Sequence, residues 1–238
     1  MNAGAVKQAL GVYASDGDAV ILQRFFKTQP GEYAEGDQFL GIKVPVTRRV
    51  CRDFRDLPLD HIEALLESPF HEHRLAALVI MTEQAKSKRT TLAHKQALFE
   101  LYLRRTDRIN NWDLVDVSCR DVVGGYLFDK PRDVLYRLAL SDDLWERRIA
   151  IVSTWEFIRR GDTHDTWQLA EALLHDKEDL MHKAIGWMLR EAGKRDLDGL
   201  LAFLDKHAHM MPRTMLRYSL EKLPESQRRH YMQFKKLG

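Results

Sequence analysis

The stretch LDHIEALLESPFHEHRLAALVIM, residues 59–81, carries the pattern that decides the fold of this chain. Its first part places aliphatic side chains at i, i+3, i+6 and i+7, one stripe along a helix: Leu59, Ile62, Leu65 and Leu66. A short polar turn follows, and a second helix then begins around the basic residue Arg74, ahead of an apolar run. The stretch therefore predicts two consecutive helices joined by a short turn.

The same order of features recurs in three later segments, which start at residues 138, 173 and 203. Each segment has a basic residue near the start of its second helix: Arg148, Lys183 and Arg213. One more unit fits between the first two segments, with Trp112 opening its second helix. The matched positions are about 30 to 38 residues apart, a period typical of HEAT and TPR-like repeats.

Helix pairs with this period stack into a curved solenoid whose second helices line the concave side. Strand signals are almost absent, and Pro and Gly cluster only at residues 29–45, which predicts a single long irregular stretch. We therefore expect an all-α fold, an α-α superhelix of HEAT-like two-helix repeats, forming one domain over residues 1–238. An irregular helical bundle with chance internal similarity is the alternative.

The composition excludes several classes of protein. The chain has 37 Lys and Arg against 35 Asp and Glu, a formal charge of +2, which excludes a polycationic tail but permits a local basic face. The two cysteines, Cys51 and Cys119, are too few for a disulfide scaffold and suit a reducing compartment. The longest apolar run, residues 75–81, is far shorter than the roughly 20 residues of a membrane span, and no secretion signal is visible. These features predict a soluble cytoplasmic protein without a membrane partner.

Unusual residues occupy matched positions of three consecutive second helices. Trp112 and Asp116 lie in one, Arg148 in the next, and Trp187 follows Lys183 by four residues in the third. Residues four apart share a helix face, so stacked repeats would bring two indoles, a carboxylate and a guanidinium to one groove wall. Aromatic faces beside a carboxylate suit a cation, or a group that becomes one. The alternative is that both tryptophans are core residues and that Asp116 is solvated or caps a helix.

The same groove is expected to be basic. The cations on or beside the second helices include Arg104, Arg105, Arg108, Arg147, Arg148, Lys183, Arg190, Lys194 and Arg195. Scattered Lys and Arg on a concave solenoid face fit the phosphate backbones of a DNA duplex. Solvated helix faces of no function are the alternative reading of these charges.

Other chemistries find little support. His71 and His73 are two residues apart, as are His207 and His209, so the members of each pair point to different sides of a helix and make poor metal ligands. No HExxH, CxxC, GxGxxG, Walker or GxSxG motif is present. We therefore expect no metal site and no cofactor.

An ordered set of short motifs resembles the AlkD family of HEAT-like-repeat DNA alkylation repair glycosylases. The motifs are RFFK, FLGIKVP and RR within residues 24–49, WDLVD at 112–116, LWERRIAIV with Arg148, and KAIGWMLRE with Trp187. They occur in the family's order and at its spacing, and they cover about residues 24 to 195. Singly they are modest motifs, and the ordered set is specific.

The resemblance implies a role for each matched residue. Asp116 looks like the catalytic carboxylate, Trp112 and Trp187 like aromatic walls against the deoxyribose, and Arg148 like the anchor of backbone and sugar. Together, the resemblance and the basic positions imply that six further residues contact DNA: Phe25, Lys27, Arg48, Arg108, Arg190 and Lys194. The family often has Tyr at the position of Phe25, and Tyr33, on an apparent insertion at PGEYAEGD, is a candidate to supply that hydroxyl.

The resemblance also implies an activity, hydrolysis of the N-glycosidic bond of positively charged alkylpurines such as N3-methyladenine and N7-methylguanine. The expected partner is double-stranded DNA containing alkylated purines, and the protein is expected to act as a monomer that associates with the nucleoid when bound to DNA. A different class stays open: a non-catalytic HEAT-like module that binds damaged or branched DNA, or a protein partner. Asp116 separates the two, since a carboxylate facing phosphates would only weaken a pure binder.

Overall fold

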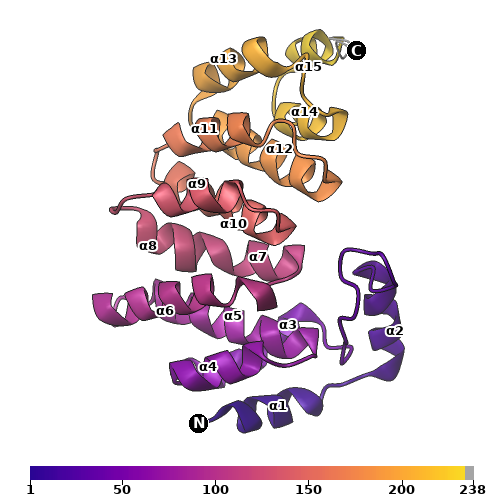
Figure 1. The fold of residues 1–238 in the computed structure, drawn as a ribbon, viewed down its shortest axis with the longest axis vertical. Helices are drawn as coiled ribbons and strands as arrows, with labels where there is room; N and C mark the ends of the chain where they lie inside the picture. Colours follow the sequence, from indigo (N-terminus) through magenta and orange to yellow (C-terminus); the bar gives the residue numbers. More distant parts are fainter. Residues whose placement is uncertain (234–238) are drawn as a thin grey trace. The chain divides into compact units, whose positions relative to one another are not determined.

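A computed structural model describes residues 1–233, and within this range the protein is all-α, as predicted (Figure 1). Along these residues no β-strand forms, and Gln38 and Phe70 make one isolated β-bridge. The chain divides into two compact units, residues 1–126 and residues 127–238. The last five positions of the predicted single domain, 234–238, lie outside the described residues, and the single domain itself stays a prediction.

The first unit contains helices of about two to four turns. They are α1 (Ala3–Gly11), α2 (Asp16–Phe25), α3 (Val44–Cys51), α4 (Leu59–Leu66), α5 (His71–Lys86), α6 (Leu92–Arg104) and α7 (Trp112–Cys119). Short 3₁₀ helices follow α3 (Arg52–Phe54) and α6 (Thr106–Arg108), and α7 continues as a π-helical turn (Arg120–Gly124). The short helix α8 (Gly125–Leu127) begins at the end of this unit.

The second unit continues the alternation of helices. Its helices are α9 (Asp133–Ala139), α10 (Leu144–Arg159), α11 (His164–Ala172), α12 (Asp179–Gly193), α13 (Leu197–His207), α14 (Arg213–Leu220) and α15 (Glu225–Met232). Over residues 1–233, no helix combines the length and the apolar character that crossing a membrane requires.

The predicted two-helix repeats are present in each unit. Residues 59–81 form α4 and most of α5, which pack together, and α9 with α10 and α11 with α12 do the same. The second helices also contact one another in series, α3, α5 and α7 in the first unit and α10, α12 and α14 in the second. The matched positions lie at or near the starts of these helices, as predicted: Arg74, Trp112, Arg148, Lys183 and Arg213.

Helix α5 forms the centre of the first unit. Its residues 71–82 are all buried, because α3, α4, α6 and α7 pack around it. Four consecutive polar residues begin this helix: His71, Glu72, His73 and Arg74. Since a buried polar group is costly unless it is hydrogen-bonded, each of them requires a partner.

The irregular stretch predicted at residues 29–45 occupies residues 26–43. Several of its residues have positive φ angles, and Gly41, at 81°, shows why glycine is needed. A Cβ on Gly41 would lie 2.1 Å from the carbonyl oxygen of Ser15, at the start of α2. The neighbouring Leu40 carbonyl accepts a 2.8 Å hydrogen bond from the Ser15 amide, so this segment folds back closely against α2.

Candidate functional site

Helix α7 carries two of the predicted site residues one turn apart. The Asn111 side chain caps the helix by accepting a hydrogen bond from the Trp112 amide, and Trp112 and Asp116 are both half-buried. Beneath them, the buried Tyr102 hydroxyl lies 2.9 Å from the Ser118 hydroxyl. Burial raises the pKa of Tyr102, and the nearby carboxylate of Asp116 adds to the shift, so this hydroxyl stays protonated.

An aromatic cluster surrounds the Trp112 indole; we define it as Phe25, Phe26, Tyr33 and Trp112. The Phe26 ring stacks on the indole with centroids 5.4 Å apart, and the Phe25 ring meets it edge-on at 6.1 Å. The indole Nε1 donates to the Tyr33 hydroxyl at 3.3 Å, and that hydroxyl donates to the Phe25 carbonyl oxygen at 3.5 Å. Phe25 is 61% exposed, so it is the solvent-facing member. The Tyr33 hydroxyl thus lies beside Phe25, and a contact of this hydroxyl with DNA stays a prediction.

A buried polar network holds the segment that carries Tyr33, and we name it the loop anchor: Asp37, His71, Glu72, Arg74, Asn110 and Asp113. The His71 ring lies between two carboxylates, 2.9 Å from Asp113 Oδ2 and 3.5 Å from Asp37 Oδ2. The Arg74 guanidinium donates to Asp37 Oδ1 at 2.7 Å. The rings of Phe26 and Phe39 both lie close to the His71 ring, at 5.0 and 4.6 Å between centroids, and stack on each other at 5.2 Å.

The ion pairs of the loop anchor shift the pKa values of His71 and Asp37. Burial acts to lower the pKa of His71, but the Asp113 carboxylate and the hydrogen bonds to Asp113 and Asp37 raise it to about 9. Burial acts to raise the pKa of Asp37, but the His71 hydrogen bond and the Arg74 charge outweigh it and hold that pKa below its usual value. The network therefore contains a protonated imidazole at neutral pH.

Glu72 completes the loop anchor through the main chain. Its carboxylate accepts three hydrogen bonds from consecutive amides of the irregular segment, Leu40 and Gly41 at 2.9 Å and Ile42 at 3.1 Å. Charge-assisted bonds of this kind are about twice as strong as neutral ones. Sequence reasoning missed the loop anchor, although four consecutive polar residues before a long apolar run were a visible signal.

The second unit holds the other two predicted site residues, on α10 and α12. Arg148 is 5% exposed and its Nη1 donates to the Leu180 carbonyl oxygen at 2.6 Å. This hydrogen bond joins α10 to α12 and so stabilises the packing of two neighbouring helix pairs. Trp187 is half-buried and meets the Trp155 ring edge-on, with centroids 5.0 Å apart.

Close packing of α14 on α12 fixes the backbone next to Trp187. A Cβ on Gly186 would lie 2.5 Å from the Met215 carbonyl oxygen and 2.6 Å from the Tyr218 Cβ. Only glycine permits this approach without a shift of the main chain. The helix face that presents Trp187 is therefore defined by direct contact between helices.

The predicted DNA-contacting cations fall into two groups. Arg108 donates to the carbonyl oxygens of Leu66, Glu67 and Ser68 and thereby caps α4. Arg190 pairs with Glu191 and Glu221, and both Lys194 contacts to Glu191 are 2.7 Å.

Lys27 and Arg48 form the second group. Both are exposed, and neither makes an ion pair with any residue in the described range 1–233.

Of the predicted site residues, the structure brings Phe25 together with Trp112, one helical turn from Asp116, and places Arg48 and Arg108 elsewhere on the first unit. The joint arrangement of Asp116, Trp112, Arg148 and Trp187 stays a prediction.

The pair His71 and His73 has the geometry expected from its spacing. His71 contacts Asp37 and Asp113, whereas the His73 Nδ1 lies 2.8 Å from the Ser68 hydroxyl, so the two rings point to different partners. Among residues 1–233, no group of three or more His, Cys, Asp or Glu side chains is arranged to hold a metal ion.

Comparisons with known proteins agree with this architecture. The family model described as DNA alkylation repair enzyme matches residues 6–223. A solved structure entitled "Predicted DNA alkylation repair enzyme from Enterococcus faecalis" is similar with a TM-score of 0.70, covering 89% of this chain and 97% of that one at 16% identity. At that identity the likeness shows the fold alone, and no curated protein sequence matches the chain. Because the family match spans nearly the whole sequence, the chain belongs to the DNA alkylation repair enzyme family.

Proposed function

We propose that this protein is a monofunctional DNA glycosylase, acting as a monomer, that releases positively charged alkylated purines from duplex DNA. Family membership supports a role in DNA alkylation repair, with DNA as the substrate. The observation that carries the finer proposal is the face of α7, where Asp116 follows Trp112 by one turn and the aromatic cluster surrounds the indole. In this proposal, the bases released are N3-methyladenine and N7-methylguanine.

The chemistry requires one carboxylate. An N3- or N7-alkylated purine already carries a positive charge, so the electron pair of the C1′–N bond neutralises it as it leaves. Ordinary glycoside hydrolysis needs a second carboxyl group to protonate the leaving group, and here that group is unnecessary. A water molecule adds to C1′ and gives up a proton, which completes the hydrolysis.

Asp116 would act on the sugar. As the glycosidic bond breaks, the deoxyribose becomes oxocarbenium-like, and a carboxylate close to it stabilises the developing charge and orients the water. The Trp112 and Trp187 faces would add cation–π attraction of about 0.5–2 kcal/mol each. Arg148 would anchor the backbone and sugar beside them, and Phe25, Lys27, Arg48, Arg108, Arg190 and Lys194 are the proposed further contacts to DNA.

Substitution of the carboxylate tests the proposal. Asp116→Asn is nearly isosteric, so we expect the fold and most DNA affinity to persist while base release falls about 10²-fold or more. The measurement is release of free 7-methylguanine from methylated duplex DNA. Asp107→Asn is the matched control, because Asp107 is an exposed acidic residue shortly before α7 and lies outside the proposed site.

Two outcomes would contradict the proposal. Release at the wild-type rate by Asp116→Asn would show that Asp116 is not the catalytic carboxylate. DNA binding by the wild-type protein without release of any methylated base would favour a non-catalytic DNA-binding module instead.

A further inference from the structure

The cations of the first unit differ in whether they have partners. Arg104 and Arg105 pair with carboxylates of Glu63, Glu67 and Asp107. In contrast, seven arginines of this unit make no ion pair with any residue between 1 and 233: Arg24, Arg48, Arg49, Arg52, Arg55, Arg89 and Arg108. Four of the seven line two adjoining hollows: Arg48, Arg52, Arg55 and Arg89. We call these four the arginine surface.

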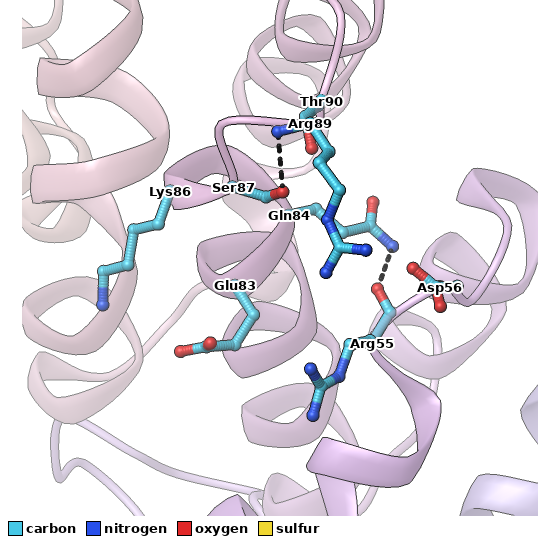
Figure 2. Close-up of a pocket in the computed structure, with 8 residues that line it drawn as sticks. All are labelled: Arg55, Asp56, Glu83, Gln84, Lys86, Ser87, Arg89 and Thr90. Atoms are coloured by element: carbon cyan, nitrogen blue, oxygen red, sulfur yellow. Dashed lines mark hydrogen bonds between the residues drawn. The ribbon is translucent and has the colours of Figure 1, made fainter.

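The arginine surface lines adjoining hollows beside the C-terminal ends of α3 and α5. One hollow, of about 280 Å³, is lined by Arg48, Arg52 and Arg55. The next, of about 400 Å³, is lined by Arg55 and Arg89 together with the hydroxyl groups of Ser87 and Thr90 (Figure 2). Because Arg55 lines both hollows, the four guanidinium groups border one continuous depression.

The floor of this depression is built by buried hydrogen bonds. Gln84 is 8% exposed, and its amide donates to the main-chain carbonyls of Arg55 and Leu57 at 2.9 Å each. Figure 2 shows the bond to Arg55. Its side-chain oxygen lies 2.7 Å from His94 Nε2, so both ends of the amide are engaged. The Arg55 Nε in turn donates to the Arg52 carbonyl oxygen at 3.0 Å, which fixes the guanidinium plane. The terminal nitrogens of Arg55 make no hydrogen bond to any residue of the described range.

The charge of the depression favours an anion. Asp56 and Glu83 also line it, but neither carboxylate is within 4.0 Å of a cationic nitrogen among residues 1–233. Lys86, on the same wall, is paired with Asp121 at 3.4 Å. Four guanidinium groups against two unpaired carboxylates leave the surface positive, and close like charges repel unless a ligand neutralises them.

Guanidinium groups match phosphate oxygens in geometry and hydration. A single small anion would need donors that converge on one point, whereas these arginines follow two adjoining hollows. An extended polyanion with regularly spaced charges fits that distribution better, and double-stranded DNA presents such a row of phosphates.

We propose that the arginine surface binds the sugar-phosphate backbone of duplex DNA, as a contact separate from the aromatic cluster and Asp116. This inference rests on the proposed function, in which DNA is the substrate, and assigns to Arg52, Arg55 and Arg89 a role alongside Arg48. Backbone contacts of this kind position the duplex and carry no information about the base.

The test compares unpaired with paired cations. Arg52→Gln/Arg89→Gln removes two charges of the arginine surface, and Lys206→Gln/Arg229→Gln removes two exposed charges that are paired with Glu171 and Glu225. Affinity for an undamaged fluorescent duplex is measured by anisotropy over a range of salt concentrations. We expect Arg52→Gln/Arg89→Gln to bind about ten-fold more weakly and its salt slope to flatten by about 2. The control pair should keep nearly the wild-type slope.

Each other outcome overturns the inference. Equal slopes for both double variants, with circular dichroism showing intact helices, would mean that the arginine surface does not contact DNA. Saturable binding of inorganic phosphate that is lost in Arg52→Gln/Arg89→Gln, without a change in the DNA slope, would instead assign a site for a free anion.

The same proteins keep the two proposals distinguishable. Release of 7-methylguanine by the wild-type protein tests the glycosylase function and does not depend on the slope comparison. Conversely, a flattened slope in a protein that releases no base would support the backbone contact and reject the glycosylase.

Discussion

The two tryptophans proposed to face the sugar are held by opposite means. Trp112 is stacked and hydrogen-bonded by residues of α2 and the irregular segment 26–43, which the loop anchor of buried charges holds in place. Trp187 meets Trp155 of the preceding second helix, and its backbone is fixed by the approach of α14 to Gly186. The position of the Trp112 indole thus depends on α2 and the irregular segment, which lie outside the repeats. The position of the Trp187 indole depends on the packing of the repeats themselves.

This difference has physical consequences. A buried ionic network loses its stabilising effect when one partner is removed or titrated, whereas contacts between apolar side chains are indifferent to pH. Perturbing the loop anchor should therefore disturb Trp112 and leave Trp187 unchanged, and perturbing α12 should do the reverse. Incorporation of 5-fluorotryptophan gives one ¹⁹F resonance for each of the five tryptophans and reports both sites separately.

Asp37→Ala should have the largest effect. It leaves the charges of Arg74 and His71 without one shared carboxylate inside the protein, and breaking a buried pair in this way costs about 3–5 kcal/mol. We expect the free energy of unfolding in urea to fall by that amount and the Trp112 resonance to move. An unmoved Trp112 resonance would show that the irregular segment does not position this indole.

Raising the pH should weaken the same network without any substitution. The pKa of His71 is raised to about 9 in the folded protein, above its ordinary value of 6.5, so its contribution is complete below pH 6.5 and is lost as the pH rises through 9. The shift corresponds to about 3 kcal/mol. Unfolding in urea at pH 6.5 and at pH 9.5 measures the loss.

His71→Gln is the control for the pH experiment, since other groups also titrate in that range. Its free energy of unfolding should change less between pH 6.5 and 9.5 than that of the wild type. Parallel pH profiles for the two proteins would rule out a protonated His71. Below pH 6.5 the stability should also decline, because burial lowers the pKa of His73 to about 4 and its neutral form is the folded one.

Gly186→Ala should have a smaller effect, confined to the other indole. The added Cβ meets main-chain and Cβ atoms of α14, and overpacking of this kind costs about 1–3 kcal/mol. We expect the Trp187 resonance to move and the Trp112 resonance to stay. Gly17→Ala, in α2 with no atom within 4 Å of the new Cβ, is the matched control and should be neutral or stabilising. Equal destabilisation by both variants would contradict the account of α12.

Periodicity predicted the helix pairs because helical spacing is a local property that the sequence displays directly. The irregular segment was predicted from its Pro and Gly residues, which are also a local signal in the sequence. The loop anchor was not, since Asp37 meets His71, Arg74 and Asn110 across 34 to 73 positions of sequence. Periodicity gives the helix on which a side chain lies, but not its partner in another segment.

The same limit applies to the basic groove. The sequence shows that Arg108, Arg190 and Lys194 are cations, but not that carbonyl oxygens and carboxylates already occupy their donors. Arg55 and Arg89 attracted no prediction, because absence of a partner becomes visible only in three dimensions. Charge count alone therefore does not tell which cations also hold the fold together.

Excision from defined duplexes tests the central claim most directly. Each duplex carries one lesion, either cationic N3-methyladenine or N7-methylguanine, or neutral hypoxanthine, uracil or 1,N6-ethenoadenine, and the released base is quantified with the wild-type protein. A site with one carboxylate and no general acid predicts release of both cationic bases and of none of the neutral ones. Efficient release of hypoxanthine, or failure to release either cationic base, would contradict the proposed mechanism.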